Sequence, residues 1–131
     1  VNWIHNPKYH SGISTSISAG VTELPDQLDG MVLCLGDMPW VSDRQINRLI
    51  DGFRPDAVRV ACFGKRRGHP ALFPRAWFEK LLALTGDDLA RCLFDHLASA
   101  VVEVPMANDA VLRDVDYEED LMPTPVGMIA Q

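Results

Sequence analysis

The chain is poor in cysteine. Its 131 residues include three cysteines, Cys34, Cys62 and Cys92, which are odd in number and lie nearly thirty residues apart. Zinc sites and redox-active pairs need thiols only a few residues apart, so these spacings exclude both kinds of motif. Two of them lie inside apolar patterns, so we expect these two to pack as small apolar side chains, and the cysteine usage as a whole fits the reducing cytoplasm.

The chain also lacks a long apolar run and an excess of positive charge. No stretch reaches the eighteen or so apolar residues of a membrane span, and no signal peptide is recognisable. The 12 Lys and Arg residues against 18 Asp and Glu residues give a net charge of −6. This balance excludes a general nucleic-acid-binding protein, which presents a basic face. One basic cluster, Lys65-Arg66-Arg67, leaves room for a local anion pocket.

What is present is typical of one folded α/β domain. Apolar residues make up 47% of the chain, so we expect a domain over residues 1–121 and a C-terminal tail over residues 122–131. The apolar patterns predict strands over residues 1–4, 31–35, 57–63, 71–73 and 101–104, and helices over residues 14–24, 42–53, 75–84 and 88–97. This alternation predicts a mostly parallel sheet with crossover helices.

The segment Met31–Pro39 is the most informative stretch of the sequence. Its first five residues are apolar without interruption, which predicts a central strand buried on both faces. The run stops at Gly36-Asp37, and ligands of open α/β sheets bind at this carboxyl edge of the strands. Asp37 suits Mg²⁺, which favours one or two carboxylates together with phosphate oxygens. The simpler alternative is that Asp37 caps the next turn.

Two other polar segments are candidate binding sites. Gly12, Ser14 and Ser16 surround the start of the first predicted helix, where free N–H groups suit a phosphate, a ribose hydroxyl or a base edge. An ordinary helix cap explains these residues equally well. Residues 64–70 form a glycine-bounded basic loop, which suits either closure over an anionic substrate or a solvated hairpin.

Asp114 and Asp116 are a third candidate feature. They are two residues apart, so on an extended chain their side chains point the same way. Two carboxylates that face the same way repel each other unless a cation or another partner compensates.

Taken together, these segments resemble a family of nucleotide-transferring enzymes. The shared motifs are Asn6-Pro7-x-Tyr9-x-x-Gly12-Ile13-Ser14-x-Ser16, Leu35-Gly36-Asp37-Met38-Pro39, Arg67-Gly68-His69-Pro70, Thr85-Gly86-Asp87 and Asp114-Val115-Asp116. Their order and spacing over most of residues 2–121 are similar to the MobA-like nucleotidyltransferases, especially the molybdenum cofactor cytidylyltransferases. The resemblance implies a Rossmann-like three-layer domain, incomplete at its N-terminus.

The resemblance also implies an activity and its partners. An enzyme of this family transfers a nucleotide from a nucleoside triphosphate, here CTP, to a phosphorylated pterin-type acceptor, and it releases pyrophosphate. Such chemistry depends on positioning and charge neutralisation, with Mg²⁺ as the cofactor. The implied roles are metal binding and catalysis by Asp37 and Asp116, with Asp114 as an alternative ligand; nucleotide binding by Gly12, Ser14, Ser16 and Gly36; and acceptor binding by Gly68, His69, Pro70, Gly86 and Asp87.

Three departures from the family pattern lead to further expectations. The family's glycine-rich triphosphate loop would lie upstream of Val1, so we expect this chain alone to be inactive and its severed sheet to favour self-association. Leu89 replaces a glycine, which would narrow the acceptor pocket, and Tyr117-Glu118 replaces Thr-Pro. The alternative functions are a non-catalytic protein that binds the molybdenum cofactor for a molybdoenzyme, and a bare α/β domain whose carboxylates are caps.

Overall fold

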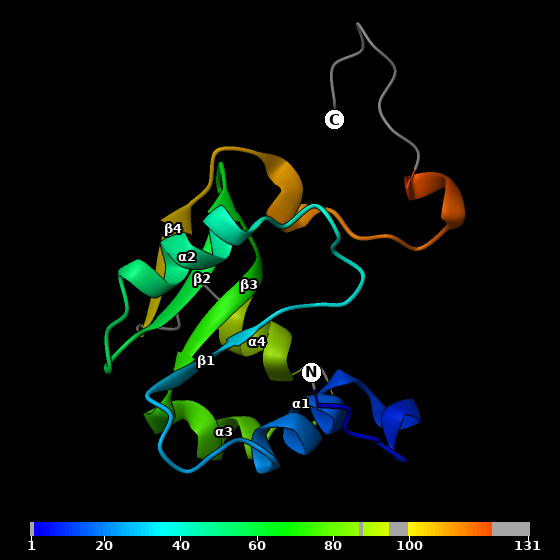
Figure 1. The fold of residues 1–131 in the computed structure, drawn as a ribbon, viewed down its shortest axis with the longest axis vertical. Helices are drawn as coiled ribbons and strands as arrows, with labels where there is room; N and C mark the ends of the chain where they lie inside the picture. The colour runs from blue at the N-terminus through cyan, green and yellow to red at the C-terminus, as the bar shows by residue number, and fades with distance from the viewer. Residues whose placement is uncertain (1, 87, 95–99, 122–131) are drawn as a thin grey trace, which may run out of the picture.

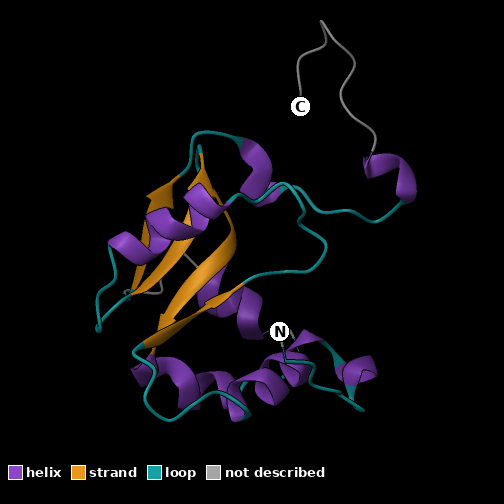
Figure 2. Cartoon of the chain, in the orientation of Figure 1, coloured by secondary structure: helices purple, strands orange, loops and turns teal. Residues whose placement is uncertain are grey.

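A four-stranded sheet forms the centre of the molecule and is covered by helices on both faces (Figure 2). A computed structural model describes residues 2–86, 88–94 and 100–121. The strands are β1 (Gly30–Leu33), β2 (Val58–Phe63), β3 (Arg66–Pro74) and β4 (Val101–Pro105), in the order β1-β3-β2-β4. β3 is antiparallel to β1 and to β2, and β2 is parallel to β4. Three of the four strands therefore run in one direction, and the predicted α/β class is confirmed.

The helices lie in two layers, one on each face of the sheet (Figure 1). α1 (Ile13–Thr22), α3 (Phe78–Leu82) and α4 (Asp88–Phe94) share one core with β2 and β3. α2 (Asp43–Asp51) and the short 3-10 helix η3 (Asp109–Leu112) share the other. The remaining 3-10 turns are η1 (Tyr9–Ser11), η2 (Arg75–Trp77) and η4 (Glu118–Leu121).

Local sequence signals explain the best-predicted elements. Ser42 begins α2 with a capping box, in which its hydroxyl accepts the Gln45 N–H at 3.3 Å and Gln45 Oε1 accepts the Ser42 N–H at 2.9 Å. In β2, Val58 and Val60 face the α1 side, whereas Ala61 belongs to the α2 core. The strand is thus buried on both faces, which suits its apolar sequence.

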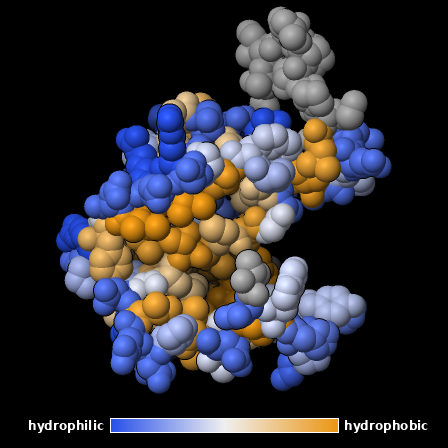
Figure 3. Space-filling view, viewed as in Figure 1, coloured by the Kyte–Doolittle hydropathy of each residue, from blue (hydrophilic) through white to orange (hydrophobic). Residues whose placement is uncertain are grey.

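The first two predicted strands need correction. Residues 2–6 form no regular structure, so the strand expected over residues 1–4 is wrong. β1 is half-buried along its length, because among the described residues it pairs with β3 alone and its other edge carries no strand. It is therefore an edge strand and not a central one. Figure 3 shows apolar side chains gathered on the surface in this part of the sheet.

The hairpin alternative for the basic loop is confirmed. β2 and β3 are joined by Gly64-Lys65, and Arg66 already pairs with Phe63. The short strand predicted over residues 71–73 is therefore part of a longer one. The helix predicted over residues 75–84 divides into η2 and α3.

The end of the helix predicted over residues 88–97, and the tail at 122–131, lie outside the described residues. Every helix within the described ranges is too short or too polar to span a bilayer.

Candidate metal and nucleotide site

Three aspartates from two distant parts of the chain meet at the rim of the sheet. One carboxylate oxygen from each of Asp37, Asp114 and Asp116 lies within 4.8 Å of the others, and all three residues are exposed. The loop after β1 supplies Asp37, and the segment after η3 supplies the other two. The Val115 N–H donates to the Asp37 carbonyl at 2.7 Å, which fixes the two segments side by side (Figure 1). The structure thus gathers all three aspartates that the sequence analysis singled out.

The donor set suits a hard divalent cation. Three carboxylates this close repel one another in the absence of a counterion, and a cation with oxygen ligands would relieve that repulsion. Oxygen ligands of Mg²⁺ lie about 2 Å from the ion, so two of them stand about 3 to 4 Å apart. Small movements of exposed side chains would close the set of three around one ion, and their exposure leaves room for phosphate oxygens.

His69 and Pro70 lie beside this cluster on β3. Leu33, the last residue of β1, pairs with Ala71, so His69 lies opposite the chain beyond the end of β1. Burial lowers the pKa of His69, and the charge of Asp37 partly offsets that effect. The imidazole and Pro70 line a pocket of about 110 Å³ whose other walls are Cys34, Leu35, Met38, Val41 and Ile46. This small pocket beside the acidic cluster is largely apolar.

Gly68 has a packing role that its sequence motif did not reveal. It is buried against η3, and a Cβ at this position would overlap the Val111 carbonyl oxygen. The absence of a side chain therefore lets β3 approach the short helix that precedes Asp114 and Asp116. Gly68 acts on the site through packing, whatever it contacts in a substrate.

The predicted nucleotide-binding residues of α1 lie at its first turn. Gly12 is the N-cap at φ +109°, a backbone conformation that favours glycine. Ser14 is buried and lines a pocket of about 410 Å³ between residues 4–8, α1 and Leu82 and Leu84. Ser16 is exposed, and its hydroxyl accepts Asn6 Nδ2 at 2.9 Å. Figure 3 shows a notch between this part of the molecule and the loop that follows β1.

Asn6 has a structural role that its sequence motif does not reveal. Its Nδ2 donates to both Thr15 Oγ1 and Ser16 Oγ at 2.9 Å, and its Oδ1 accepts the Lys8 N–H at 3.0 Å. These bonds hold the N-terminal segment on α1. In the sequence, the Asn6-Pro7 pair is part of a family motif, and no local pattern indicates that Asn6 bonds to α1. Gly36, the remaining predicted nucleotide contact, is exposed beside Asp37.

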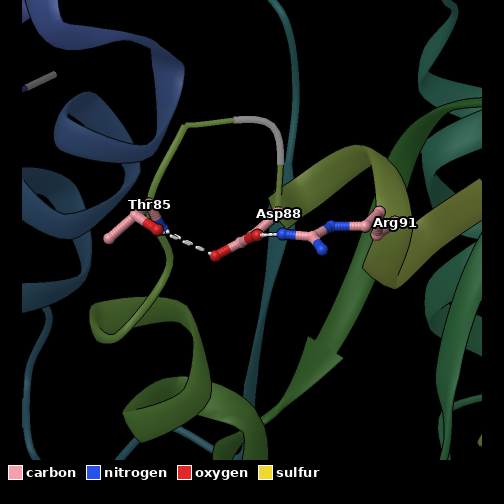
Figure 4. Close-up of polar contacts among 3 residues, drawn as sticks. All are labelled: Thr85, Asp88 and Arg91. Atoms are coloured by element: carbon pink, nitrogen blue, oxygen red, sulfur yellow. Dashed lines mark hydrogen bonds and ion pairs between the residues drawn. The ribbon is translucent and has the colours of Figure 1, made fainter.

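The turn at Thr85-Gly86 is held by Asp88. The Asp88 carboxylate accepts the Thr85 N–H at 3.1 Å and the Thr85 hydroxyl at 3.0 Å, and it also pairs with Arg91 (Figure 4). Gly86 has φ +52°, and Asp87 lies outside the described residues.

Leu89 replaces a glycine of the family pattern. Its side chain is buried in the core that α1, α3 and α4 share, where it packs with Ile17 and Leu93. The narrowing of an acceptor pocket by Leu89 stays a prediction, and the structure adds that the side chain is part of this core.

A mixed sheet between helical layers, with polar residues at the carboxyl ends of its parallel strands, is typical of the Rossmann-like class of α/β proteins. A family profile described as "MobA-like NTP transferase domain" matches residues 1–101. The chain belongs to this family. Among curated proteins, none matches the chain.

Solved structures agree with that assignment. The Rv0371c homolog from Mycobacterium sp. strain JC1 is 30% identical, with a TM-score of 0.68 over 80% of this chain and 52% of that one. Rv0371c from Mycobacterium tuberculosis H37Rv is 28% identical, with a TM-score of 0.73 over 83% of this chain and 57% of that one. A manganese complex of Rv0371c is also similar, at 28% identity and a TM-score of 0.69 over 80% and 56% of the two chains. The chain spans little more than half the length of these proteins.

Proposed function

We propose that this chain carries the metal-binding and acceptor-side part of a divalent-metal-dependent nucleotidyltransferase. The observation that supports the proposal most is the convergence of Asp37, Asp114 and Asp116 within 4.8 Å, in a chain of the MobA-like family. A structure of the similar Rv0371c was solved with manganese. In this proposal Asp37 and Asp116 hold Mg²⁺ or Mn²⁺, and Asp114 completes or alternates in the ligand set.

The reaction we propose is transfer of CMP from CTP to a phosphorylated pterin-type acceptor. An oxygen of the acceptor phosphate attacks the α-phosphorus of CTP, a new P–O bond forms, and the bond to the β-phosphate breaks to release pyrophosphate. The metal supplies charge neutralisation for the triphosphate and the leaving group. The residues of this chain position the reactants: the three aspartates hold the metal, Gly12, Ser14, Ser16 and Gly36 contact the nucleotide, and Gly68, His69, Pro70, Gly86 and Asp87 face the acceptor.

Direct metal binding is the first experiment. Electron paramagnetic resonance of Mn²⁺ should detect one bound ion per chain, and Asp37→Asn should weaken binding by at least tenfold because it removes a charged ligand. Asp51→Asn, which removes the same charge at the exposed end of α2, is the matched control and should bind as the unaltered chain does. Equal binding by the Asp37 and Asp51 variants would refute the proposed metal site.

Pyrophosphate release is the second experiment. The full-length protein would be assayed with Mg²⁺, a phosphorylated pterin, and either CTP or GTP. Release with CTP, and its loss in Asp37→Asn and Asp116→Asn, is the expected result. Pterin binding without any metal-dependent nucleotide binding would instead favour the non-catalytic cofactor-binding role. If the folded protein shows neither activity nor ligand binding, the remaining interpretation is an α/β domain whose carboxylates are caps.

A further inference from the structure

A second pocket on the same rim has the opposite charge. It has a volume of about 530 Å³, and it lies between the tip of the β2–β3 hairpin and η3. Its lining residues are Phe63, Gly64, Lys65, Arg66, Asp109, Leu112 and Arg113. Three cations therefore face one carboxylate, in a chain whose net charge is −6.

The cations of this pocket are available to a ligand. Among the described residues, the ion pairs within 4 Å are Arg54–Asp56, Arg67–Glu103 and Arg91–Asp88, so Lys65, Arg66 and Arg113 are in none of them. Arg67 differs from these three cations, because its side chain is buried and donates hydrogen bonds to Glu103 and to the Leu93 carbonyl. Of the three adjacent basic residues, the first two line the pocket and the third is structural.

The hairpin backbone places Lys65 at the tip, and an aromatic ring orients Arg113. Gly64, at φ +61°, takes the first position of the two-residue hairpin loop, where an L side chain would be strained, and so places Lys65 at the tip. The guanidinium carbon of Arg113 lies 4.2 Å from the centre of the Trp40 ring, a cation–π contact that orients it. An oriented guanidinium loses less conformational freedom when it binds an anion.

The position of the pocket indicates which anion it takes. Arg113 directly precedes Asp114 of the acidic cluster, so the pocket adjoins the proposed metal site. The first turn of α1, with its predicted nucleotide contacts, lies at the other end of the molecule from the hairpin tip (Figure 1). A phosphate held beside Lys65 and Arg66 would thus approach the metal from the side away from α1.

We infer that Lys65, Arg66 and Arg113 form an anion pocket that binds the phosphate of the acceptor. The assignment to the acceptor rests on the proposed function, whereas the anion pocket itself rests on the geometry of these three cations. Exposed Phe63 at the pocket wall would contact the apolar part of such a molecule.

The test is a titration of the ¹⁵N-labelled chain with inorganic phosphate, followed by nuclear magnetic resonance. Phosphate should shift the amide signals of Gly64, Lys65, Arg66 and Arg113 without any metal. The double variant Lys65→Ala/Arg66→Ala should weaken binding about tenfold, because it removes two of the three cations. The control Arg44→Ala/Arg48→Ala removes the same charge from the exposed face of α2 and should bind phosphate normally.

The outcomes separate this inference from the proposed function. No shift at the hairpin, or an equal loss in both double variants, would overturn the anion pocket even if Mn²⁺ binds at the aspartates. Phosphate shifts that appear only with Mg²⁺ present would overturn the acceptor assignment, because they would indicate phosphates bound through the metal. Normal phosphate binding by Asp37→Asn, which loses Mn²⁺, would confirm that the two sites are separate.

Discussion

Arg66 and Arg67 are adjacent in β3, yet their environments are opposite. Arg66 is exposed at the pocket near the hairpin tip, whereas the Arg67 side chain is 8% exposed, lies 2.8 Å from Glu103 and donates to the Leu93 carbonyl at 2.9 Å. Alternation of side chains along a strand separates the two roles. A run of three basic residues in the sequence gives no means of telling them apart.

This difference predicts unequal effects on stability. Arg67→Ala leaves a buried carbonyl and the Glu103 carboxylate without their partner, so the free energy of unfolding should fall by about 1–3 kcal/mol. Arg66→Ala, at an exposed position, should change it by less than about 0.5 kcal/mol. Urea denaturation of both variants measures the difference, and equal losses would contradict the structural role assigned to Arg67.

His69 predicts how stability depends on pH. Burial lowers its pKa in the folded chain, so the neutral imidazole is the form that folding favours. Below the ordinary histidine pKa of about 6.5, the unfolded chain gains a proton that the folded chain resists. The free energy of unfolding should therefore fall as the pH drops below that value, and the full contribution is present above it.

The measurement is urea denaturation at a series of pH values from neutral to mildly acidic. His69→Gln should flatten this dependence relative to the unaltered chain. Identical pH dependence in the variant and the unaltered chain would show that His69 makes no such contribution.

At the scale of elements, the contact between β3 and η3 positions the acidic cluster. Gly68 lies against the backbone of Val111, and η3 leads directly to Asp114 and Asp116. A second contact fixes η3 to α2. Gln45 Nε2 donates to Asn108 Oδ1 at 3.0 Å, and the same oxygen accepts the Ala110 N–H at the start of η3. η3 is therefore fixed from both the sheet and the neighbouring helix.

Gly68→Ala should disturb this arrangement. Its Cβ would overlap the Val111 carbonyl oxygen, so we expect the free energy of unfolding to fall by about 1–3 kcal/mol and Mn²⁺ affinity to fall with it. Gly20→Ala is the matched control, because open space surrounds this residue of α1 and the change should stabilise the chain by about 0.5–1 kcal/mol. Thermal unfolding and Mn²⁺ titration of both variants test this, and unchanged Mn²⁺ affinity in Gly68→Ala would contradict the positioning role.

At the scale of the whole molecule, the acidic cluster exists only in the folded chain. Its members come from the loop after β1 and from the segment after η3. A cation that binds this cluster should raise stability, by about 2.7 kcal/mol when free Mn²⁺ is about 100 times its dissociation constant. Thermal denaturation with and without Mn²⁺ measures the effect. Asp37→Asn should abolish most of it, and an unchanged increase in that variant would place the metal elsewhere.

The sequence determined the local elements and the kinds of side chain at the site. The apolar runs of β2 and β4, the capping box at Ser42 and the two-residue spacing of Asp114 and Asp116 act over a few residues, so their patterns could be interpreted without a structure. The order of the family motifs over most of residues 2–121 indicated the fold through resemblance to a known family.

Only the tertiary structure decided which residues meet. It made β1 an edge strand, turned Leu89 into the core, and set Gly68 against η3. It also brought Asp37 to the later aspartates through the Val115–Asp37 bond and closed the cationic pocket from the hairpin and η3. These contacts join residues far apart in the chain, and they depend on packing and strand pairing, which no local pattern encodes.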